Sequence, residues 1–325
     1  MFKALTLKKD PEFSAQIEIL DQSQLAKTDT LVSVEYSTLN YKDGLAITNS
    51  GPVVRKWPMV AGIDGAGVVL ESASPDWQVG DLVIHNGWGY GETQWGCLSQ
   101  LAACEANRLV RLPSQLTTRQ AMGIGTAGYT AMLSVLALEE QGLKPGNGEV
   151  VVTGATGGVG SIAIALLSRL GHEVVAVSAK TSSFDYLKSL GASHVMDRRE
   201  LSLAGKPLQK ERWAGAIDTV GSFTLANICA QMQYRSTVAV CGLAQGADLP
   251  LTVMPFILRG VRLIGIDSVM APIARRQLAW ARLAQDLDCS KLEQMIEDIQ
   301  LEEAIERSKA FMAGEVVGRI VVHLR

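Results

Sequence analysis

The residues that point most directly to a chemistry are the glycines within residues 149–161, EVVVTGATGGVGS. An apolar run leads into a glycine cluster, and a helical pattern begins directly after it. A bound pyrophosphate needs backbone that can come close to it, together with the free N–H groups of a helix N-terminus. The pattern Gly-x-Gly-x-x-Gly falls on Ala155, Gly157 and Gly160, so alanine replaces the first glycine. We predict a dinucleotide site in this loop, with a glycine-rich turn that binds nothing as the alternative.

Polar residues after the next apolar run indicate which dinucleotide would bind. In the segment EVVAVSAKTSS the apolar run ends at Ser178, which lies 18 residues after Gly160. NAD-binding proteins carry an acid about 20 residues along, which holds the ribose 2′-hydroxyl. Ser178 and Lys180 stand there instead, and Arg198 follows the next strand, SHVMDRR. A hydroxyl and two cations suit a 2′-phosphate, so we predict NADP(H). The alternative is that Lys180 and Arg198 are ordinary solvated charges.

Cysteine and histidine spacing indicates no metal. Zinc sites need three or four Cys, His or acidic ligands that converge. Cys97 and Cys104 are the nearest pair of cysteines, and no other cysteine lies near them. Without a Lewis acid, oxidation of an alcohol loses its usual stabilisation of the alkoxide, whereas reduction of a polarised C=C bond stays feasible. The four histidines are scattered along the chain at His85, His172, His194 and His323.

The elements that position these residues fall into three zones, which differ in their pattern of apolar and turn-forming residues. Residues 1–120 alternate or cluster apolar residues between Gly, Pro, Asp and Asn, which predicts a partly open β-barrel with few helices. Residues 120–265 alternate strand and helix patterns with short turns, which predicts a doubly wound parallel sheet. The last 60 residues contain two helical patterns and a final strand, GRIVVHLR. We expect an α/β protein of two domains.

The final strand decides how the domains are connected. A lone strand after helices is expected to rejoin a sheet formed earlier, most simply the N-terminal one. We therefore predict a catalytic domain at 1–122, a nucleotide-binding domain at 123–262, and a return to the catalytic domain at 263–325. The alternative is that the last 60 residues extend the middle domain.

Composition excludes several other classes of protein. The net charge of the 325 residues is −3, and Lys and Arg cluster only in pairs, so we expect no nucleic-acid partner. Two stretches without charge, Gln120–Leu138 and Val150–Ser168, are interrupted by glycines, and we interpret them as buried segments rather than membrane spans. Five irregularly spaced cysteines argue against a disulfide framework, which makes the cytoplasm the expected compartment.

Longer segments resemble a known family. The chain is similar to the medium-chain dehydrogenase/reductase superfamily, and within it to the zinc-free, quinone-oxidoreductase-like branch that includes the bacterial NADPH-dependent acrylyl-CoA reductases. The resemblance covers nearly the whole chain. The segments that carry it are STLNYKDGLAITN (37–49), PMVAGIDGAGVV (58–69), GTAGYTAM (125–132), VVTGATGGVGS (151–161), YLKSLGAS (186–193), GAIDTVG (215–221) and VMPFILRGVRLIGIDSV (253–269).

The resemblance implies a GroES-like barrel joined to a Rossmann domain, without zinc. Where zinc-dependent relatives carry Cys, this chain has Asn40–Tyr41, and where they carry Gly-His-Glu it has Gly62–Ile63–Asp64. Close relatives can carry Arg at position 180, and Lys keeps that charge but loses the planar two-pronged contact. The resemblance implies that Tyr41 faces the nicotinamide and the substrate, and that the nicotinamide also passes Leu243, Ile257 and Ser268. It implies that the pyrophosphate is surrounded by Thr156, Gly157, Gly158 and Val159, and that the 2′-phosphate is held by Ser178, Ala179, Lys180 and Arg198. Ala313 is implied as a further cofactor contact.

The implied reaction is NADPH-dependent reduction of the C=C bond of an α,β-unsaturated acyl-CoA, acrylyl-CoA to propionyl-CoA. Hydride would add to the β-carbon, N–H donors would stabilise the enolate oxygen, and Tyr41 or a water that it orients would protonate the α-carbon. The alternative for Tyr41 is that it only binds the cofactor. The alternative activities are reduction of a quinone and a non-catalytic role as an NADPH-binding regulatory protein.

Two further expectations concern partners. The phosphates of a CoA substrate need cations, and the candidates are Arg259, Arg262, Arg275 and Arg276. The alternative for each is a solvated surface or interface charge. The apolar run VRLIGI (261–266) is expected to form the last strand of the parallel sheet. An apolar sheet edge invites pairing with a second copy, so we expect a homodimer.

Overall fold

The chain folds into two compact units, which are described separately. The computed structural model describes the backbone of residues 1–325 and every side chain except that of Thr181. The functional domain boundaries placed at residues 122 and 262 stay a prediction. The first unit contains 1–126, 268–284 and 292–325, and the second contains 127–267 and 285–291.

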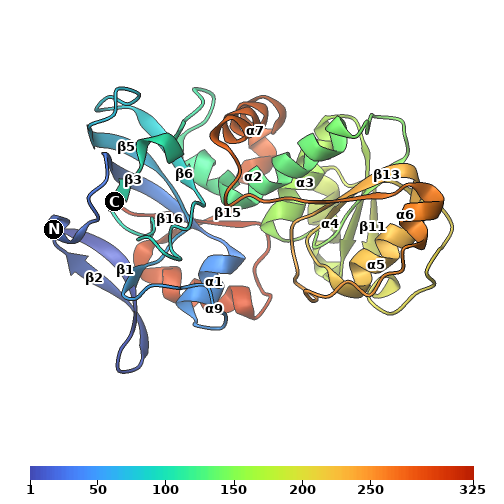
Figure 1. Ribbon diagram of the computed structural model, residues 1–325, viewed down its shortest axis with the longest axis horizontal. Helices are drawn as coiled ribbons and strands as arrows, with labels where there is room; N and C mark the ends of the chain where they lie inside the picture. The colour runs from blue at the N-terminus through green and yellow to red at the C-terminus, as the bar shows by residue number, and fades with distance from the viewer. The chain divides into compact units, whose positions relative to one another are not determined.

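The first unit is built on two β-sheets (Figure 1). The larger, seven-stranded sheet has the order β15-β16-β3-β5-β6-β8, with β7 also paired to β3, and the smaller has the order β2-β1-β4. All their pairs are antiparallel except β15 with β16. The strands are β1 (Phe2–Lys9), β2 (Phe13–Leu20), β3 (Thr30–Leu39), β4 (Met59–Val60), β5 (Asp64–Ser72), β6 (Leu82–Asn86), β7 (Leu101–Cys104), β8 (Val110–Arg111), β15 (Ile296–Gln300) and β16 (Arg319–His323).

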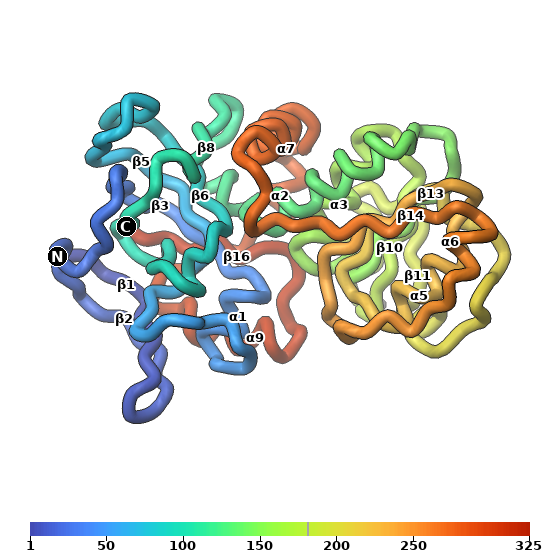
Figure 2. Tube along the Cα trace, in the orientation of Figure 1, coloured from blue at the N-terminus to red at the C-terminus, as the bar shows by residue number. Residues whose placement is uncertain are grey.

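The last strand completes the sheet formed by the N-terminal residues. β16 pairs antiparallel with β3, from Ile320 opposite Leu39 to His323 opposite Tyr36, which confirms the predicted return of GRIVVHLR. In Figure 2 the C-terminus lies among the strands of the N-terminal segment. Three successive apolar residues of this strand, Ile320–Val322, are fully buried, so both faces of the strand are covered. This pairing brings Arg319 next to the end of β3.

The second unit contains the predicted Rossmann-type sheet. Six parallel strands have the order β11-β10-β9-β12-β13-β14, and β14 forms the edge, as expected for VRLIGI. Buried Val, Ile and Ala dominate these strands, as is typical of a parallel sheet that is covered on both faces. The strands are β9 (Glu149–Val152), β10 (Glu173–Ser178), β11 (His194–Asp197), β12 (Trp213–Asp218), β13 (Met232–Val240) and β14 (Arg262–Gly265).

The strand order reverses between β9 and β12. Right-handed crossovers then place α3 and α4 on one face of the sheet and α5 and α6 on the other. Ligands of such sheets bind outside the carboxyl ends of the strands at this reversal. The helices of the chain are α1 (Tyr41–Ile47), α2 (Thr118–Glu140), α3 (Gly158–Arg169), α4 (Phe184–Leu190), α5 (Ser222–Gln231), α6 (Met254–Arg259), α7 (Ile273–Asp286), α8 (Cys289–Glu293) and α9 (Ala304–Met312).

Helix α2 contains the first stretch without charge. It is long and apolar enough to span a membrane, but 94% of its most apolar window is buried within the protein. Gly125 breaks its regular geometry, with φ of 52° and ψ of −163°. The expectation that Gln120–Leu138 is a buried segment is therefore confirmed.

A buried guanidinium joins three distant segments of the first unit. Arg319, at the start of β16, is 2% exposed. Its Nε donates to the Gly123 carbonyl at 2.9 Å, its Nη2 to Thr38 Oγ1 at 2.8 Å, and its Nη1 to Asn40 Oδ1 at 3.2 Å. One side chain thus connects the last strand to β3, to α2, and to the residue that precedes α1.

Asn40 connects this cation to two buried carboxylates. Its amide Nδ2 donates to Asp64 Oδ2 at 2.8 Å and to Asp43 Oδ2 at 3.1 Å. Asp64 is fully buried and also accepts from Asn86 Nδ2 at 2.9 Å and from the Thr126 backbone N–H at 2.7 Å. Every oxygen of this carboxylate therefore has a donor.

The second carboxylate, Asp43, anchors the first turn of α1. Its Oδ2 accepts from the Asn40 backbone N–H at 2.9 Å, and its Oδ1 accepts from the Ile63 N–H at 3.0 Å. Burial and the nearby Asp64 charge raise the pKa of Asp43 to about 7, although these hydrogen bonds oppose the shift. Burial lowers the pKa of Arg319 to about 10, opposed by both carboxylates.

We predict that Arg319→Met lowers the free energy of unfolding by about 3 kcal/mol or more, because the substitution leaves buried carboxylates without their cation. The loss will be greater at pH 8 than at pH 5. Loss of the cation raises the folded-state pKa of Asp43 further, and stability from a raised carboxyl pKa is present at low pH and disappears as pH rises through that pKa. Urea unfolding at both pH values measures this.

The control for this prediction is Arg111→Met. Arg111 forms an exposed ion pair with Asp81 at 2.6 Å, and such pairs contribute roughly 0–1 kcal/mol. An Arg319 variant no less stable than this control, at either pH, would show that the buried guanidinium does not hold the unit together.

Candidate functional site

The glycine loop between β9 and α3 allows no side chain at two of its positions. Gly154 has φ of +55°, and a Cβ there would lie 2.1 Å from Thr219 Oγ1. A Cβ at Gly160 would lie 2.5 Å from the Gly154 carbonyl oxygen, because the helix packs closely on the loop. Gly157 is the N-cap of α3 and is exposed. The loop therefore presents backbone and a helix N-terminus, as a pyrophosphate requires.

The alanine that replaces the first glycine of the pattern is compatible with this geometry. Ala155 is fully buried and has a negative φ, and its N–H donates to the Val177 carbonyl at 3.2 Å. Its own carbonyl accepts from Ser161 Oγ at 3.2 Å. The departure from the glycine pattern thus costs the loop nothing in backbone strain.

Hydrogen bonds hold the loop at the strand reversal. Thr153 Oγ1 donates to Asp218 Oδ1 at 2.7 Å and accepts from the Thr219 N–H at 2.9 Å. Asp218 Oδ2 also accepts from the Gly221 N–H at 2.8 Å. Burial raises the pKa of Asp218, and the Thr153 hydroxyl opposes that shift. The carboxyl ends of β9 and β12 are therefore joined beside the candidate pyrophosphate position.

The candidate 2′-phosphate residues lie together at the carboxyl ends of β10 and β11. Ser178 is paired in register with Asp197, so Arg198 follows directly beside Ser178. Asp197 is the acid nearest this position in the register, but its Oδ2 accepts from Arg199 Nη2 at 2.6 Å and its Oδ1 caps the turn at the Arg199 N–H. Its carboxylate is thus occupied by Arg199, while Arg198 is exposed.

Lys180 completes this group. Its backbone N–H donates to Ser178 Oγ at 3.0 Å, and its side chain is partly buried. Burial lowers the pKa of Lys180. Ala179, between them, is exposed. The structure therefore brings together the serine, the lysine and the arginine that the sequence predicted.

The structure places two further predicted residues elsewhere in the second unit. Leu243 follows β13 and is 63% exposed at the carboxyl edge, where a Cβ on Gly221 would lie 3.4 Å from its Cα. Ile257 lies within α6 and is 71% exposed. Their roles at a nicotinamide stay predictions.

Tyr41 and Ala313 lie on two helices of the first unit that pack together. Tyr41 is the first residue of α1 and is 50% exposed. Ala313 is the exposed C-cap residue of α9. The helices approach closely at Gly44, where a Cβ would lie 3.3 Å from the Phe311 Cβ. The Tyr41 ring is therefore free to meet a ligand, and the network around Asn40 fixes the backbone that carries it.

Ser268 belongs to the same unit and is held by a buried arginine. Its carbonyl accepts from Arg276 Nη2 at 3.1 Å. Arg276 is 1% exposed, donates to the Asn86 carbonyl at 2.8 Å, and lies over the Trp88 ring at 4.3 Å. The hypothesis that Arg276 binds a substrate phosphate is therefore wrong, because this helix position faces inward.

Arg259 is also engaged in the fold. Its Nη1 donates to the Ala230 carbonyl at 3.0 Å and to the Met232 carbonyl at 3.2 Å, and its side chain is only 12% exposed. Arg259 therefore ties α6 to the start of β13.

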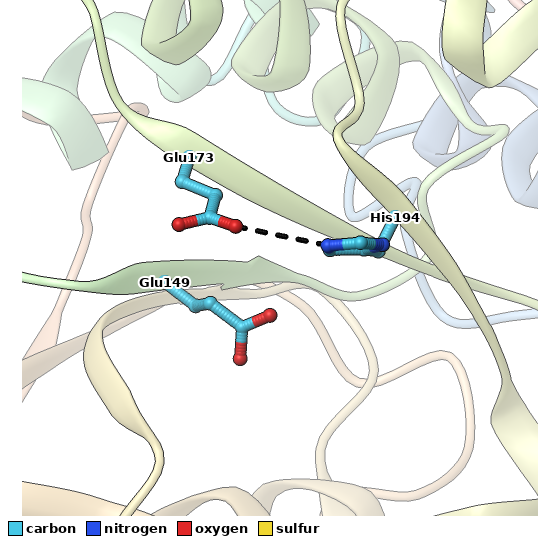
Figure 3. Close-up of side chains that lie close together, drawn as sticks. All are labelled: Glu149, Glu173 and His194. Atoms are coloured by element: carbon cyan, nitrogen blue, oxygen red, sulfur yellow. Dashed lines mark ion pairs between the residues drawn. The ribbon is translucent and has the colours of Figure 1, made fainter.

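Among the residues that the structure describes, one group of three could reach a common metal ion. Glu149, Glu173 and His194 begin β9, β10 and β11, at the edge of the sheet opposite the glycine loop (Figure 3). Glu149 accepts from Arg212 Nε at 2.8 Å, and Glu173 lies 3.7 Å from His194 Nε2. These contacts account for the group as surface ion pairs, so it gives no reason to revise the expectation that the chain holds no metal.

Sequence reasoning missed part of the polar network beside Tyr41. Asn40 and Asp64 drew attention only as replacements for metal ligands, and Asp43 and Arg319 were not considered. The spacing of Asn40 and Asp43 is that of a capping box, which could have suggested their contact. An arginine beginning an apolar strand could have suggested a buried cation, but not its partners.

Two sequence families match the chain. The model described as "Alcohol dehydrogenase GroES-like domain" matches residues 26–114. The model described as "Zinc-binding dehydrogenase" matches residues 158–285.

Individual relatives match over nearly the whole length. The acrylyl-CoA reductase AcuI of Ruegeria pomeroyi is 50% identical over 99% of both chains. The crystal structure of the Salmonella enterica yhdH oxidoreductase in complex with NADP is 51% identical, with a TM-score of 0.98 over 99% of this chain and 100% of its own. The Bacillus subtilis protein yhfP, crystallised with NAD bound, is 42% identical, with a TM-score of 0.96 over 99% of both chains. The chain therefore belongs to the medium-chain dehydrogenase/reductase superfamily, in the group that includes the acrylyl-CoA reductases.

Proposed function

We propose that this protein is an NADPH-dependent, zinc-independent reductase of the C=C bond of a short α,β-unsaturated acyl-CoA, with acrylyl-CoA as the substrate and propionyl-CoA as the product. The observation that carries the proposal is the glycine loop at the strand reversal, with Ser178, Lys180 and Arg198 gathered beside it. The named relative of 50% identity acts on this class of substrate.

The residues of the second unit fit NADP(H). The close approach of Gly160 to the Gly154 carbonyl leaves bare backbone for a pyrophosphate, with Thr156 to Val159 around it. At the next two strand ends, one hydroxyl and two cations can receive the 2′-phosphate, and the carboxylate of Asp197 is neutralised by Arg199. When bound, this cofactor supplies the hydride.

In the first unit we assign proton transfer to Tyr41. Its half-exposed phenol can donate to the α-carbon of the enolate that forms on the substrate, directly or through a water. The overall reaction then consumes one hydride and one proton. Asn40 and Asp43 set the start of α1, so they hold the phenol in place without touching substrate themselves.

Hydrogen bonding at Asp64 supports the zinc-independent reading. Both of its oxygens accept from protein donors, and the amide of Asn40 lies between it and Arg319. A carboxylate with all its oxygens occupied is a poor metal ligand, and an amide nitrogen does not replace a thiolate. We therefore assign the polarisation of the substrate to hydrogen-bond donors rather than to a metal.

The proposal extends to the assembly and the compartment. β14 is an edge strand with a partly buried Leu263 and Ile264, so we propose that it pairs with a second copy to form a homodimer. The five cysteines are free, which suits the cytoplasm.

Substrate choice tests the activity itself. We predict that initial rates of NADPH oxidation with acrylyl-CoA exceed those with benzoquinone by at least tenfold at equal concentrations. The rate is followed as loss of NADPH absorbance, and propionyl-CoA is identified by mass spectrometry. Faster turnover of benzoquinone would favour the quinone reductase alternative. NADPH binding without turnover of either acceptor would favour a regulatory protein.

Cofactor choice is tested at Lys180. We predict that Lys180→Ala raises the KM for NADPH about tenfold and leaves the KM for NADH unchanged, because a partly buried charge-assisted contact to the 2′-phosphate contributes on the order of 1.4 kcal/mol. Steady-state kinetics with both coenzymes measures this. Lys188→Ala, which removes the same charge from exposed α4, is the control and should change neither value. An equal loss for both coenzymes in Lys180→Ala would contradict the assignment.

The proton donor is tested by Tyr41→Phe. We predict a fall in kcat of about a hundredfold with an unchanged Kd for NADPH, because general acid catalysis typically contributes about 10²–10⁴-fold. Tyr36→Phe, on β3 of the same unit, is the control and should keep full activity. Normal turnover in Tyr41→Phe would leave this residue only a binding role.

A further inference from the structure

We propose a second ligand site in the second unit, for a small organic anion with a carboxylate or phosphate group. It is a hollow of about 280 Å³ that Asn147, Gln233, Arg235 and Thr237 help to line. It lies by the first residues of β13 and just before β9, so it is at the amino-terminal edge of the parallel sheet. The glycine loop is at the opposite edge, so the inference does not depend on the proposed reductase activity.

The first observation is a buried hydroxyl that the fold leaves unused. Thr237 is 4% exposed, and among the side chains that the structure describes its Oγ1 has no hydrogen-bond partner. Thr237 is in register with Gly215 on β12, and a Cβ on Gly215 would meet the Leu143 side chain at 3.1 Å. Since register partners in parallel strands face the same side, the Thr237 side chain lies on the Leu143 side of the sheet, where both residues line the hollow. A buried polar group without a partner is rare and calls for an explanation.

The second observation is a strained backbone at Arg235, the one cation among the described residues that line the hollow. Arg235 has φ of +60°, a conformation that costs energy because it brings the Cβ close to the following carbonyl oxygen, and that glycine or asparagine adopts more easily. Its carbonyl accepts from Arg262 Nη1 at 2.8 Å, which holds the turn in this form. Strain of this kind persists where the side chain is needed at that position.

The charge of the lining selects the ligand class. The described residues of the hollow include Arg235 and no carboxylate. The Asn147 Oδ1 accepts from the Lys144 N–H at 2.9 Å, so this amide offers its N–H groups as donors. Glu211, which accepts from the N–H of the lining residue Tyr234, pairs with Arg259 at 3.4 Å. A guanidinium, an amide donor and a free hydroxyl together suit an oxyanion.

The volume of the hollow limits the size of the ligand. About 280 Å³ is at the lower end of the roughly 300–1,000 Å³ found for small-molecule sites. A dinucleotide or a whole CoA does not fit, whereas a short dicarboxylate or a phosphomonoester does.

The experiment is calorimetric titration of the full-length protein with inorganic phosphate and, separately, with succinate. Saturable binding of one of them is expected and tells phosphate from carboxylate. Thr237→Val and Arg235→Asn should each weaken that binding at least tenfold. Both should leave the melting temperature unchanged or raised, since valine keeps the shape of threonine without the unused hydroxyl and asparagine tolerates the left-handed backbone.

Thr224→Val is the matched control. The Thr224 hydroxyl is buried in the same unit but donates to Gln245 Oε1 at 2.7 Å, so its loss should lower the melting temperature and leave anion binding unchanged. Absence of binding of both probes, or equal binding by wild type and Arg235→Asn, would overturn the proposal. So would a Thr237→Val protein that is destabilised and binds normally. The Kd for NADPH should be unchanged in each variant, and a parallel loss would show that no separate site exists.

Discussion

The first unit depends on one constraint, which is that a guanidinium with 2% exposure must satisfy its donors inside the protein. Arg319 does so by reaching the Gly123 carbonyl, Thr38 and Asn40, which come from segments nearly 200 to 280 residues away. None of these contacts forms unless β16 has paired with β3 and α2 has bent at Gly125, where a Cβ would lie 2.6 Å from Arg319 Nη2. The buried guanidinium can therefore be satisfied only when the C-terminal strand β16 has paired with β3.

The same constraint reaches the chemistry. Asn40 accepts from Arg319 with its oxygen and donates to Asp64 and Asp43 with its nitrogen, so its amide has one orientation only. That orientation sets the N-terminus of α1 and hence the place of Tyr41, the residue to which we assign proton transfer. Asn40 and Asp64 stand where zinc-dependent relatives carry metal ligands, and here they form a hydrogen-bond network instead. Both oxygens of Asp64 are hydrogen-bonded, so in our proposal electrophilic assistance comes from hydrogen-bond donors, which suits a conjugated thioester better than an alcohol.

Local patterns were enough to predict the parallel sheet, its edge strand and the glycine loop, because each depends on residues close in sequence. The grouping of Ser178 with Arg198 followed from the rule that parallel strands end at one edge. Elements with weak patterns were missed: β2 has few fully buried positions, β15 contains two exposed charges, and the short α6 begins around Pro255. Arg276 was misjudged because the sequence does not tell which of two adjacent arginines on a helix faces inward, and only the packing of Arg276 against Trp88 decides it. Asp43 and Arg319 could not be paired without the topology.

The two edges of the Rossmann-type sheet differ in a way that bears on how each is used. At the carboxyl edge, polar groups such as Thr153, Asp218 and Ser178 are satisfied by one another or by backbone, and the glycines are placed where no side chain fits. At the amino edge, Thr237 has an unused hydroxyl and Arg235 a strained backbone. A single substitution at either residue, Thr237→Val or Arg235→Asn, would remove the corresponding cost. Sequences retain such local costs chiefly where a function needs them, so the strained edge is the better place to look for a ligand that no sequence motif announces.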